Sequence, residues 1–264
     1  MRLTIRLSII ALFGLVIGGA ALVGLRAGRE EALHEQPDVP VAALPSATNT
    51  DQQIAGLLAR IERLPESAEA YTSLGAAYLQ KARESGDPTF YARAETALNR
   101  SLALDGENAE TYLELGVLAL ARHQFEDGLV YGRRAHELNP YKAAALGVIG
   151  DAQVELGRYE EAAATFQAME DRRPDLASFA RLSYMRELHG DLPGAIELMK
   201  RAVIAAPGSE AHAWTQVQLG HLYFASGDLD AAEKEYERTL FQRPGYLHAR
   251  AGIARIAAAR GDYA

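Results

Sequence analysis

Residues 108–174 read NAETYLELGVLALARHQFEDGLVYGRRAHELNPYKAAALGVIGDAQVELGRYEEAAATFQAMEDRRP, a stretch in which one pattern of 34 residues occurs twice. The two copies match at six pairs of positions: Tyr112 and Leu146, Leu115 and Ile149, Gly116 and Gly150, Gly128 and Ala162, Ala135 and Met169, and Pro140 and Pro174. Self-similarity at this period is typical of stacked helix-turn-helix units. The sequence therefore predicts an all-α repeat architecture.

The matched positions resemble the tetratricopeptide repeat. In that family an aromatic residue, a Leu-Gly pair and a second aromatic residue mark the first helix of each repeat. Two small residues around an aromatic or aliphatic one mark the second helix, and a proline closes the unit. The resemblance extends over residues 66–264. It implies a right-handed α-solenoid of helix-turn-helix repeats, whose first helices line a concave groove.

The same pattern recurs on both sides of the double copy. The expected repeats are residues 68–107, 109–142, 143–175, 176–208 and 211–245, with a partial repeat at 247–264 and a capping half-repeat helix at 51–65. The first repeat carries seven more residues between its helix patterns than the family does. Turn-forming residues at 84–88 predict that this insertion is a longer loop between the two helices.

Small residues occupy the two positions of each repeat at which helices should touch. They are Gly75, Gly116, Gly150, Ser183, Gly220 and Ala254 in the first helices, and Ala94, Gly128, Ala162, Ala195 and Ala232 in the second helices. Helix axes that approach to about 8–10 Å need a small side chain at the crossing. This recurrence predicts close helix packing throughout the array.

The amino end of the chain carries a hydrophobic segment. Residues 7–25 form an uncharged apolar run of 19 residues with two arginines on either side. At about 1.5 Å per residue, a helix of this length nearly spans the ~30 Å hydrocarbon core of a bilayer. We therefore expect residues 1–27 to be an N-terminal transmembrane helix that precedes the repeats. A cleaved signal peptide is the alternative, with Gly18-Gly19-Ala20 as its small-residue site.

Residues 28–50 contain three prolines and no helical periodicity, which predicts a linker. The charges around the apolar run are nearly balanced, and the terminal amine favours an orientation with the amino end inside the cell. We therefore expect the repeats on the extracytoplasmic side, periplasmic or extracellular. If a signal peptide were cleaved, the protein would be secreted. The order of anchor, linker and repeats resembles membrane-anchored bacterial envelope proteins of this repeat class.

Composition and motifs argue against several kinds of chemistry. The formal net charge of −8 gives no electrostatic footprint for a phosphate backbone, so we expect no nucleic-acid partner. The chain has no cysteine, which excludes disulfides, thiol catalysis and thiolate metal sites. No two histidines have the i, i+4 spacing of a helical metal site, and neither a glycine-rich phosphate loop nor a serine elbow occurs. We expect no catalytic residue, metal or cofactor.

The family resemblance also implies which side chains face a partner. The positions that correspond to groove-lining residues of the family are Leu113, Val117, Asp151, Tyr184, Glu187, Trp214, His221, Phe224 and Arg255. Aromatic residues supply much of the contact energy at interfaces, and the histidine and arginine could fix the polar part of a ligand. The alternative is that several of these side chains pack between neighbouring first helices. The lysine and asparagine clamp of chaperone-binding repeats is absent, since Thr72 and Ala76 occupy its positions.

Taken together, these features favour a membrane-tethered, non-catalytic scaffold that binds a protein or peptide in its groove. One alternative is the N-terminal regulatory or targeting arm of a larger enzyme, such as a transferase, with its catalytic domain beyond residue 264. Another is a passive spacer without a ligand. Partner identity, organism and oligomeric state do not follow from the sequence.

The carboxyl end falls inside a repeat. We expect the apolar side of residues 247–259, including Ile253 and Ile256, to lack a covering helix. Either the chain is a fragment of a longer protein, or this end pairs with another surface.

Overall fold

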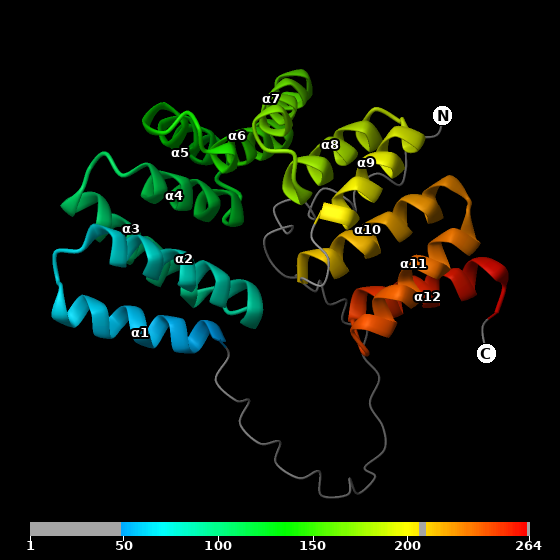
Figure 1. Cartoon of the computed structure of the whole chain (residues 1–264), viewed down its shortest axis with the longest axis horizontal. Helices are drawn as coiled ribbons and strands as arrows, with labels where there is room; N and C mark the ends of the chain where they lie inside the picture. The colour runs from blue at the N-terminus through cyan, green and yellow to red at the C-terminus, as the bar shows by residue number, and fades with distance from the viewer. Residues whose placement is uncertain (1–48, 206–209, 263–264) are drawn as a thin grey trace, which may run out of the picture. The chain divides into compact units, whose positions relative to one another are not determined.

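A computed structural model describes residues 49–205 and 210–262, and over these ranges it contains twelve α-helices and no strand (Figure 1). The predicted all-α architecture is confirmed for this part of the chain. The expected anchor at residues 1–27 and nearly all of the expected linker at 28–50 lie outside the described residues. Within the described ranges, no helix combines the length and the hydrophobicity that crossing a membrane requires.

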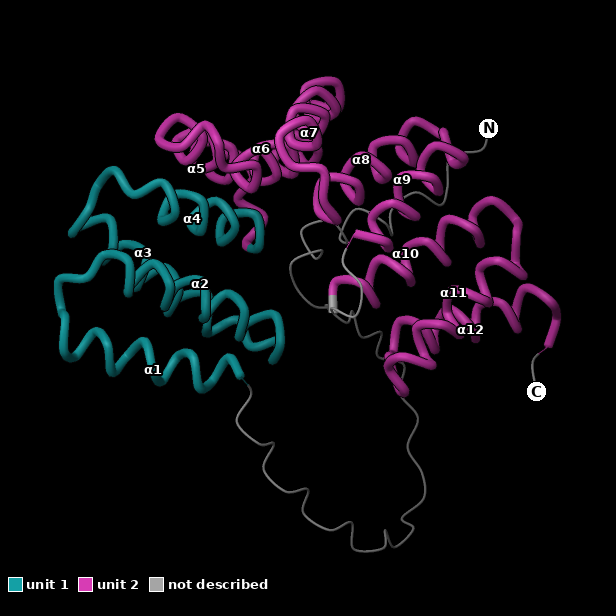
Figure 2. The backbone as a smooth tube through the Cα atoms, viewed as in Figure 1, with its two compact units in different colours: residues 1–121 teal, residues 122–264 magenta. Residues whose placement is uncertain are grey.

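The chain forms two compact units, residues 1–121 and residues 122–264 (Figure 2). The helices of unit 1 are α1 (Asn49–Arg63), α2 (Ala68–Ser85), α3 (Thr89–Leu104) and α4 (Ala109–Ala121). The helices of unit 2 are α5 (Phe125–Leu138), α6 (Ala143–Glu155), α7 (Tyr159–Arg172), α8 (Leu176–Leu188), α9 (Leu192–Ala205), α10 (Glu210–Ser226), α11 (Leu229–Gln242) and α12 (Leu247–Arg260). Within each unit, consecutive helices pack against each other.

The insertion in the first repeat lengthens its helices and not its loop. Helix α2 has 18 residues where α4 has 13, and α3 has 16 where α5 has 14. The connection 86–88 is as short as the connection 156–158 between α6 and α7. The expected longer loop is therefore wrong.

The added turn of α2 is stabilised by the start of α1. Lys81 Nζ lies 2.6 Å from Oδ1 of Asp51, and Thr50 Oγ1 donates a 2.7 Å hydrogen bond to Oε1 of Glu84. The helix ends at Gly86, whose φ of 68° lies in the left-handed region that glycine adopts without strain. Because the residues before Gly86 have partners on α1, they extend the helix.

Glycines let two aromatic rings enter the core of unit 2. A Cβ atom at Gly150 of α6 would overlap the ring of Phe166 on α7. On α11, the ring of Tyr236 would lie 2.5 Å from a Cβ at Gly220 and 2.6 Å from one at Gly252. Both aromatic side chains are fully buried. The close approach that Gly150 and Gly220 predict is present, and Gly252 adds a contact that the repeat pattern did not indicate.

Helix α12 is better covered than its sequence suggests. Ile256 is buried, with only 1% of its surface exposed, in a cluster that includes Val217 of α10 and Tyr236 of α11. Ile253 is half-buried against the same cluster. The expectation that Ile253 and Ile256 lack cover is wrong, because α12 packs on both α10 and α11. Leu247, at the start of α12, does remain exposed.

Candidate functional site

Four of the expected groove residues hold the same position in the first helices of unit 2. Asp151 of α6, Tyr184 of α8, His221 of α10 and Arg255 of α12 each follow the small residue of their helix directly. We call these four residues the row. Its side chains change from acidic to basic along the chain order of the helices. Neighbouring helical turns carry the other expected residues of this unit, namely Glu187, Trp214 and Phe224.

A buried ion pair joins α6 to α8 at the acidic end of the row. Arg181 donates from Nε to Oδ1 of Asp151 over 2.8 Å and from Nη2 to Oδ2 over 2.7 Å. The two side chains are 4% and 8% exposed. Burial acts to lower the pKa of Arg181, and the charge of Asp151 offsets this and leaves that pKa raised. A Cβ at Gly147 would lie 3.4 Å from Cζ of Arg181, at van der Waals contact with the guanidinium.

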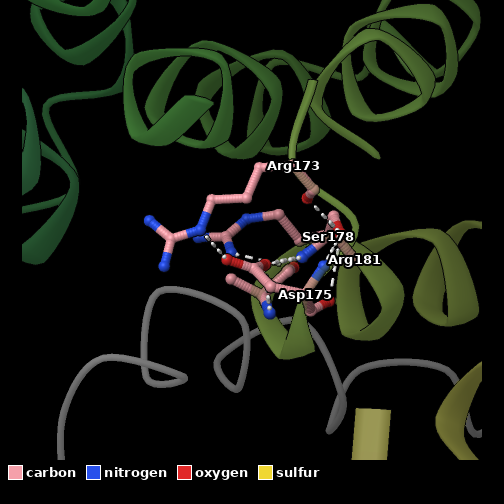
Figure 3. Close-up of polar contacts among 5 residues, drawn as sticks. Arg173, Asp175, Ser178 and Arg181 are labelled. Carbon is pink, nitrogen blue, oxygen red and sulfur yellow. Dashed lines mark hydrogen bonds and ion pairs between the residues drawn. The ribbon is translucent and has the colours of Figure 1, made fainter. Parts of the chain in front are cut away.

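The start of α8 fixes where Arg181 lies (Figure 3). Asp175 caps the helix, because its Oδ1 accepts from the backbone N–H groups of Ala177 and Ser178 at 3.0 and 3.1 Å. In return, the backbone N–H of Asp175 donates to Oγ of Ser178 over 3.0 Å. Arg173 pairs with the same carboxylate at 2.9 Å, and Arg181 donates to the carbonyl of Ala177 over 3.1 Å. A capping box therefore holds the turn from which Arg181 reaches Asp151.

Carboxylates surround the phenol of Tyr184. Its side chain is buried, and burial, followed by the charges of Glu155 and Glu187, raises its pKa to about 12. The pKa of Glu155 is raised by burial and by Asp151, and that of Glu187 is raised by burial. Glu155 and Glu187 are half-buried. This end of the row can therefore accept hydrogen bonds from a cationic or N–H group of a ligand.

The other end of the row combines a neutral histidine with an exposed arginine. Nδ1 of His221 lies 2.7 Å from the hydroxyl of Tyr236, with the two ring centroids 5.5 Å apart. Burial, then the charges of Arg255 and His248, lowers the pKa of His221 to about 4. Arg255 is exposed, and its Cζ lies 4.5 Å from the ring centroid of Phe224. A guanidinium on an aromatic face keeps its N–H groups available for a carboxylate.

Two half-buried aromatic residues flank the basic end. Trp214 packs against a cluster of α8, α9 and α10 that includes Phe179 and Leu219, and Phe224 packs against the cluster around Tyr236. Each is anchored in the core along one edge and retains some exposed surface. Tryptophan is among the residues that most often carry binding energy at interfaces, and both rings offer apolar area to a partner.

The structure divides the nine expected groove residues into two groups. Leu113, Asp151 and Tyr184 are buried, at 5%, 7% and 3% exposed, so they pack between helices in this conformation. Val117, Glu187, Trp214, His221 and Phe224 are half-buried, and Arg255 is exposed. Leu113 and Val117 belong to α4 of unit 1, and the other seven belong to unit 2.

Sequence reasoning missed the partners that organise the row. Arg181 was not singled out. A charged residue directly before the apolar Leu182 does not by itself show whether its side chain is buried in an ion pair or lies at the surface. Tyr236, which lies 2.7 Å from Nδ1 of His221, was not singled out either. No group of three His, Asp or Glu side chains within the described ranges is placed to hold a metal ion.

The depressed pKa of His221 predicts that acid weakens unit 2. The pKa is about 4 in the folded protein and 6.5 in its unperturbed form, so between these values the unfolded chain binds the proton and the folded chain does not. The free energy of unfolding should therefore fall as pH drops through this window, by about 1–2 kcal/mol between pH 7 and pH 5. Chemical unfolding at pH 7 and at pH 5 measures this decrease. We expect the variant His221→Gln to lack the part of the decrease that comes from His221. His123→Asn, at an exposed histidine of unit 2, should keep it, and equal pH dependence in the two variants would contradict the assignment.

Comparison with known proteins identifies the repeat. Two sequence models described as the tetratricopeptide repeat match the chain, one at residues 118–177 and 148–210 and the other at residues 188–256. Together they span slightly more than half of the 264 residues. The resemblance to tetratricopeptide repeats is thereby confirmed over this range. The resemblance to membrane-anchored envelope proteins stays a prediction.

Two solved structures share the fold, and one relative shares part of the sequence. The thermophilic tetratricopeptide-repeat protein TTC0263 of Thermus thermophilus has a TM-score of 0.62 at 22% identity, with 74% of this chain and 99% of that chain covered. The Cut9–Hcn1 hetero-tetramer of the anaphase-promoting complex has a TM-score of 0.69 at 16% identity, with 80% and 40% covered. Subunit 7 of the anaphase-promoting complex of Arabidopsis thaliana is 28% identical over 166 residues. That match spans 63% of this chain and 29% of the plant protein.

Proposed function

We propose that this chain, whose residues 118–256 are tetratricopeptide repeats, is a non-catalytic scaffold that binds an extended segment of a protein partner along the row of unit 2. Folds of this repeat class suggest protein–protein interaction, and the similar Cut9–Hcn1 structure is an assembly of two proteins. The observation that carries the proposal is the order of charge along the first helices, from half-buried carboxylates on α6 and α8 to Arg255 on α12.

The chemistry of the row and of the side chains on neighbouring helical turns specifies the partner segment. Glu155 and Glu187 would accept from a lysine or arginine of the partner, and Arg255 would bind a carboxylate. Apolar side chains between these charges would lie on Trp214 and Phe224. With about 10 Å between successive first helices, the two steps from α8 through α10 to α12 span roughly 20 Å. An extended chain covers this span with about six residues.

Tethering of this scaffold to a membrane through residues 7–25, with the repeats on the extracytoplasmic side, belongs to the same proposal. It is supported by the length and hydrophobicity of that run. The mass of the mature protein tests it, because loss of the first residues up to about position 20 would mean a cleaved signal peptide and a secreted scaffold.

Charge reversal at Arg255 should weaken partner binding. Peptides selected from a random library on the immobilised full-length protein are expected to carry a basic and an acidic residue about six positions apart. We expect Arg255→Glu to reduce the affinity of such a peptide about tenfold or more, because a charge-assisted hydrogen bond contributes about 1.5–3 kcal/mol. The measurement is fluorescence polarisation with the labelled peptide.

Arg250→Glu provides the matched control. Arg250 is also exposed on α12, five residues from Arg255 and therefore on another side of the helix. Its reversal changes the net charge equally and should leave the affinity unchanged. Selected peptides without the charge pattern, or equal affinities for the two variants, would remove the row as the binding surface.

A further inference from the structure

A second candidate binding site lies in unit 1, between α2 and α3. Residues of these helices line a cavity of about 440 Å³ that is open to solvent. Its volume is within the usual range for ligand sites of about 300–1,000 Å³. Its lining residues are Tyr71, Leu74 and Tyr78 of α2, and Arg93, Thr96, Ala97 and Arg100 of α3. None of them was expected to line the concave groove. All seven belong to unit 1, so the cavity shares no residue with the row of unit 2.

Arginine and aromatic side chains form one layer at each end of the cavity. At one end, Cζ of Arg100 lies 5.9 Å from the ring centroid of Tyr71. At the other end, Cζ of Arg93 lies 5.0 Å from the centroid of Phe90, whose ring centroid is 6.0 Å from that of Tyr78. Both arginines are on α3, seven residues and thus about 10 Å apart along the helix.

An apolar floor separates the two layers. Leu74 and Ala97 line the cavity and are buried, at 4% and 5% exposed. Arg93 and Arg100 are exposed, and neither forms an ion pair with any carboxylate in the described part of the chain. Between the charge of Arg93 and the half-buried Asp87 there is only a longer-range attraction, which helps to lower the pKa of Asp87. Arginines that stack on rings without an ion-pair partner leave their planar N–H groups available to an incoming anion.

We propose that this cavity binds a short acidic segment of a partner protein, with two carboxylates three residues apart in a polyproline II conformation. This conformation has three residues per turn and rises about 3.1 Å per residue, so the two carboxylates lie on the same side, about 9 Å apart, close to the spacing of about 10 Å between the two arginines along α3. An apolar side chain between the carboxylates would lie on Leu74 and Ala97. Charge complementarity favours a peptide over a nucleic acid, because the net charge of −8 repels a long polyanion while two arginines suffice for two carboxylates.

The test uses the full-length protein and a defined probe. The probe is a fluorescein-labelled peptide in which Glu-Leu-Leu-Glu is flanked by glycine and serine residues, and its binding is followed by fluorescence polarisation at low ionic strength. We expect Arg93→Glu and Arg100→Glu each to reduce its affinity about tenfold or more. A peptide with both glutamates replaced by glutamine should not bind. Arg63→Glu, at an exposed arginine of α1, is the matched control and should leave the affinity unchanged.

A charge-swapped probe separates loss of binding from loss of folding. The double variant Arg93→Glu/Arg100→Glu should bind a peptide with lysines in place of the two glutamates, which an unfolded site could not do. Binding of the acidic probe to this double variant with wild-type affinity would overturn the proposal, as would no binding to the wild type. Displacement of the probe by a short single-stranded DNA of equal concentration would also overturn it.

The chain itself contains a segment with the proposed spacing, Glu35-Gln36-Pro37-Asp38. If Glu35→Lys/Asp38→Lys in the full-length protein raised the affinity of the probe tenfold, the occupant would be this segment, and the assignment to a partner would be overturned. The proposal does not depend on the row. Arg255→Glu should leave this probe unaffected, so either site can fail without the other.

Discussion

Replacing Arg181 with alanine is expected to destabilise unit 2 by about 3–5 kcal/mol, because it leaves Asp151 as a buried carboxylate without its partner. The side chain of Asp151 is only 8% exposed, and both of its oxygens accept from the guanidinium. Chemical unfolding of the full-length protein, followed by circular dichroism, measures the loss.

A double substitution distinguishes the unpaired charge from simple loss of packing. Asp151→Leu/Arg181→Met removes both charges and keeps apolar volume in the contact. Exchanges of this kind at buried ion pairs are often neutral or stabilising. We expect the double variant to recover most of the stability that Arg181→Ala loses. If Arg181→Ala cost less than about 1 kcal/mol, or if the double variant were as unstable as the single one, the pair would not hold α6 and α8 together.

The ion pair of Asp151 and Arg181 could not be predicted from the repeat pattern. Asp151 was assigned to the groove because it holds the position that lines it in the family. Its partner lies 30 residues further along, at a position that the repeat pattern leaves free. A pattern of small and apolar residues reports which backbones touch, but it does not report which polar side chains meet between them. Leu113 and Tyr184 are buried for a related reason, since the repeat pattern gives their register and their burial depends on the neighbouring helix.

The fold itself was predictable because its signal is repeated. Glycine and alanine recur wherever two helices approach, and a helix-interior glycine costs about 1 kcal/mol relative to alanine, so its recurrence implies a packing requirement. Features that occur once were not predictable in this way. The seven inserted residues of the first repeat look like a loop until Lys81 and Glu84 are seen to contact α1. Likewise, Ile256 looks exposed until α12 is seen to pack on two helices at once.

Truncation of Phe166 to alanine should produce a second large effect, a loss of about 3–5 kcal/mol. Its ring is fully buried and fills the space that Gly150 leaves on α6. The complementary change, Gly150→Val, adds a side chain where the ring already lies and should cost about 1–3 kcal/mol through overpacking. Gly56→Val on α1 is the matched control, because a Cβ at Gly56 has no neighbour within 4 Å. We expect the control to change the free energy of unfolding by less than about 0.5 kcal/mol.

Combining the two changes tests whether glycine and ring are fitted to each other. In Gly150→Val/Phe166→Ala, the added valine enters the cavity that the lost ring leaves, so the double variant should be less destabilised than the sum of the single variants by about 1 kcal/mol or more. Strict additivity would mean that the two residues act independently. Gly150 would then be required only for the short distance between the helices. The recurrence of glycine would not indicate that an aromatic ring packs against it. A double variant less destabilised than the sum would predict the same coupling at Gly220 and Gly252, where an added Cβ would meet the ring of Tyr236.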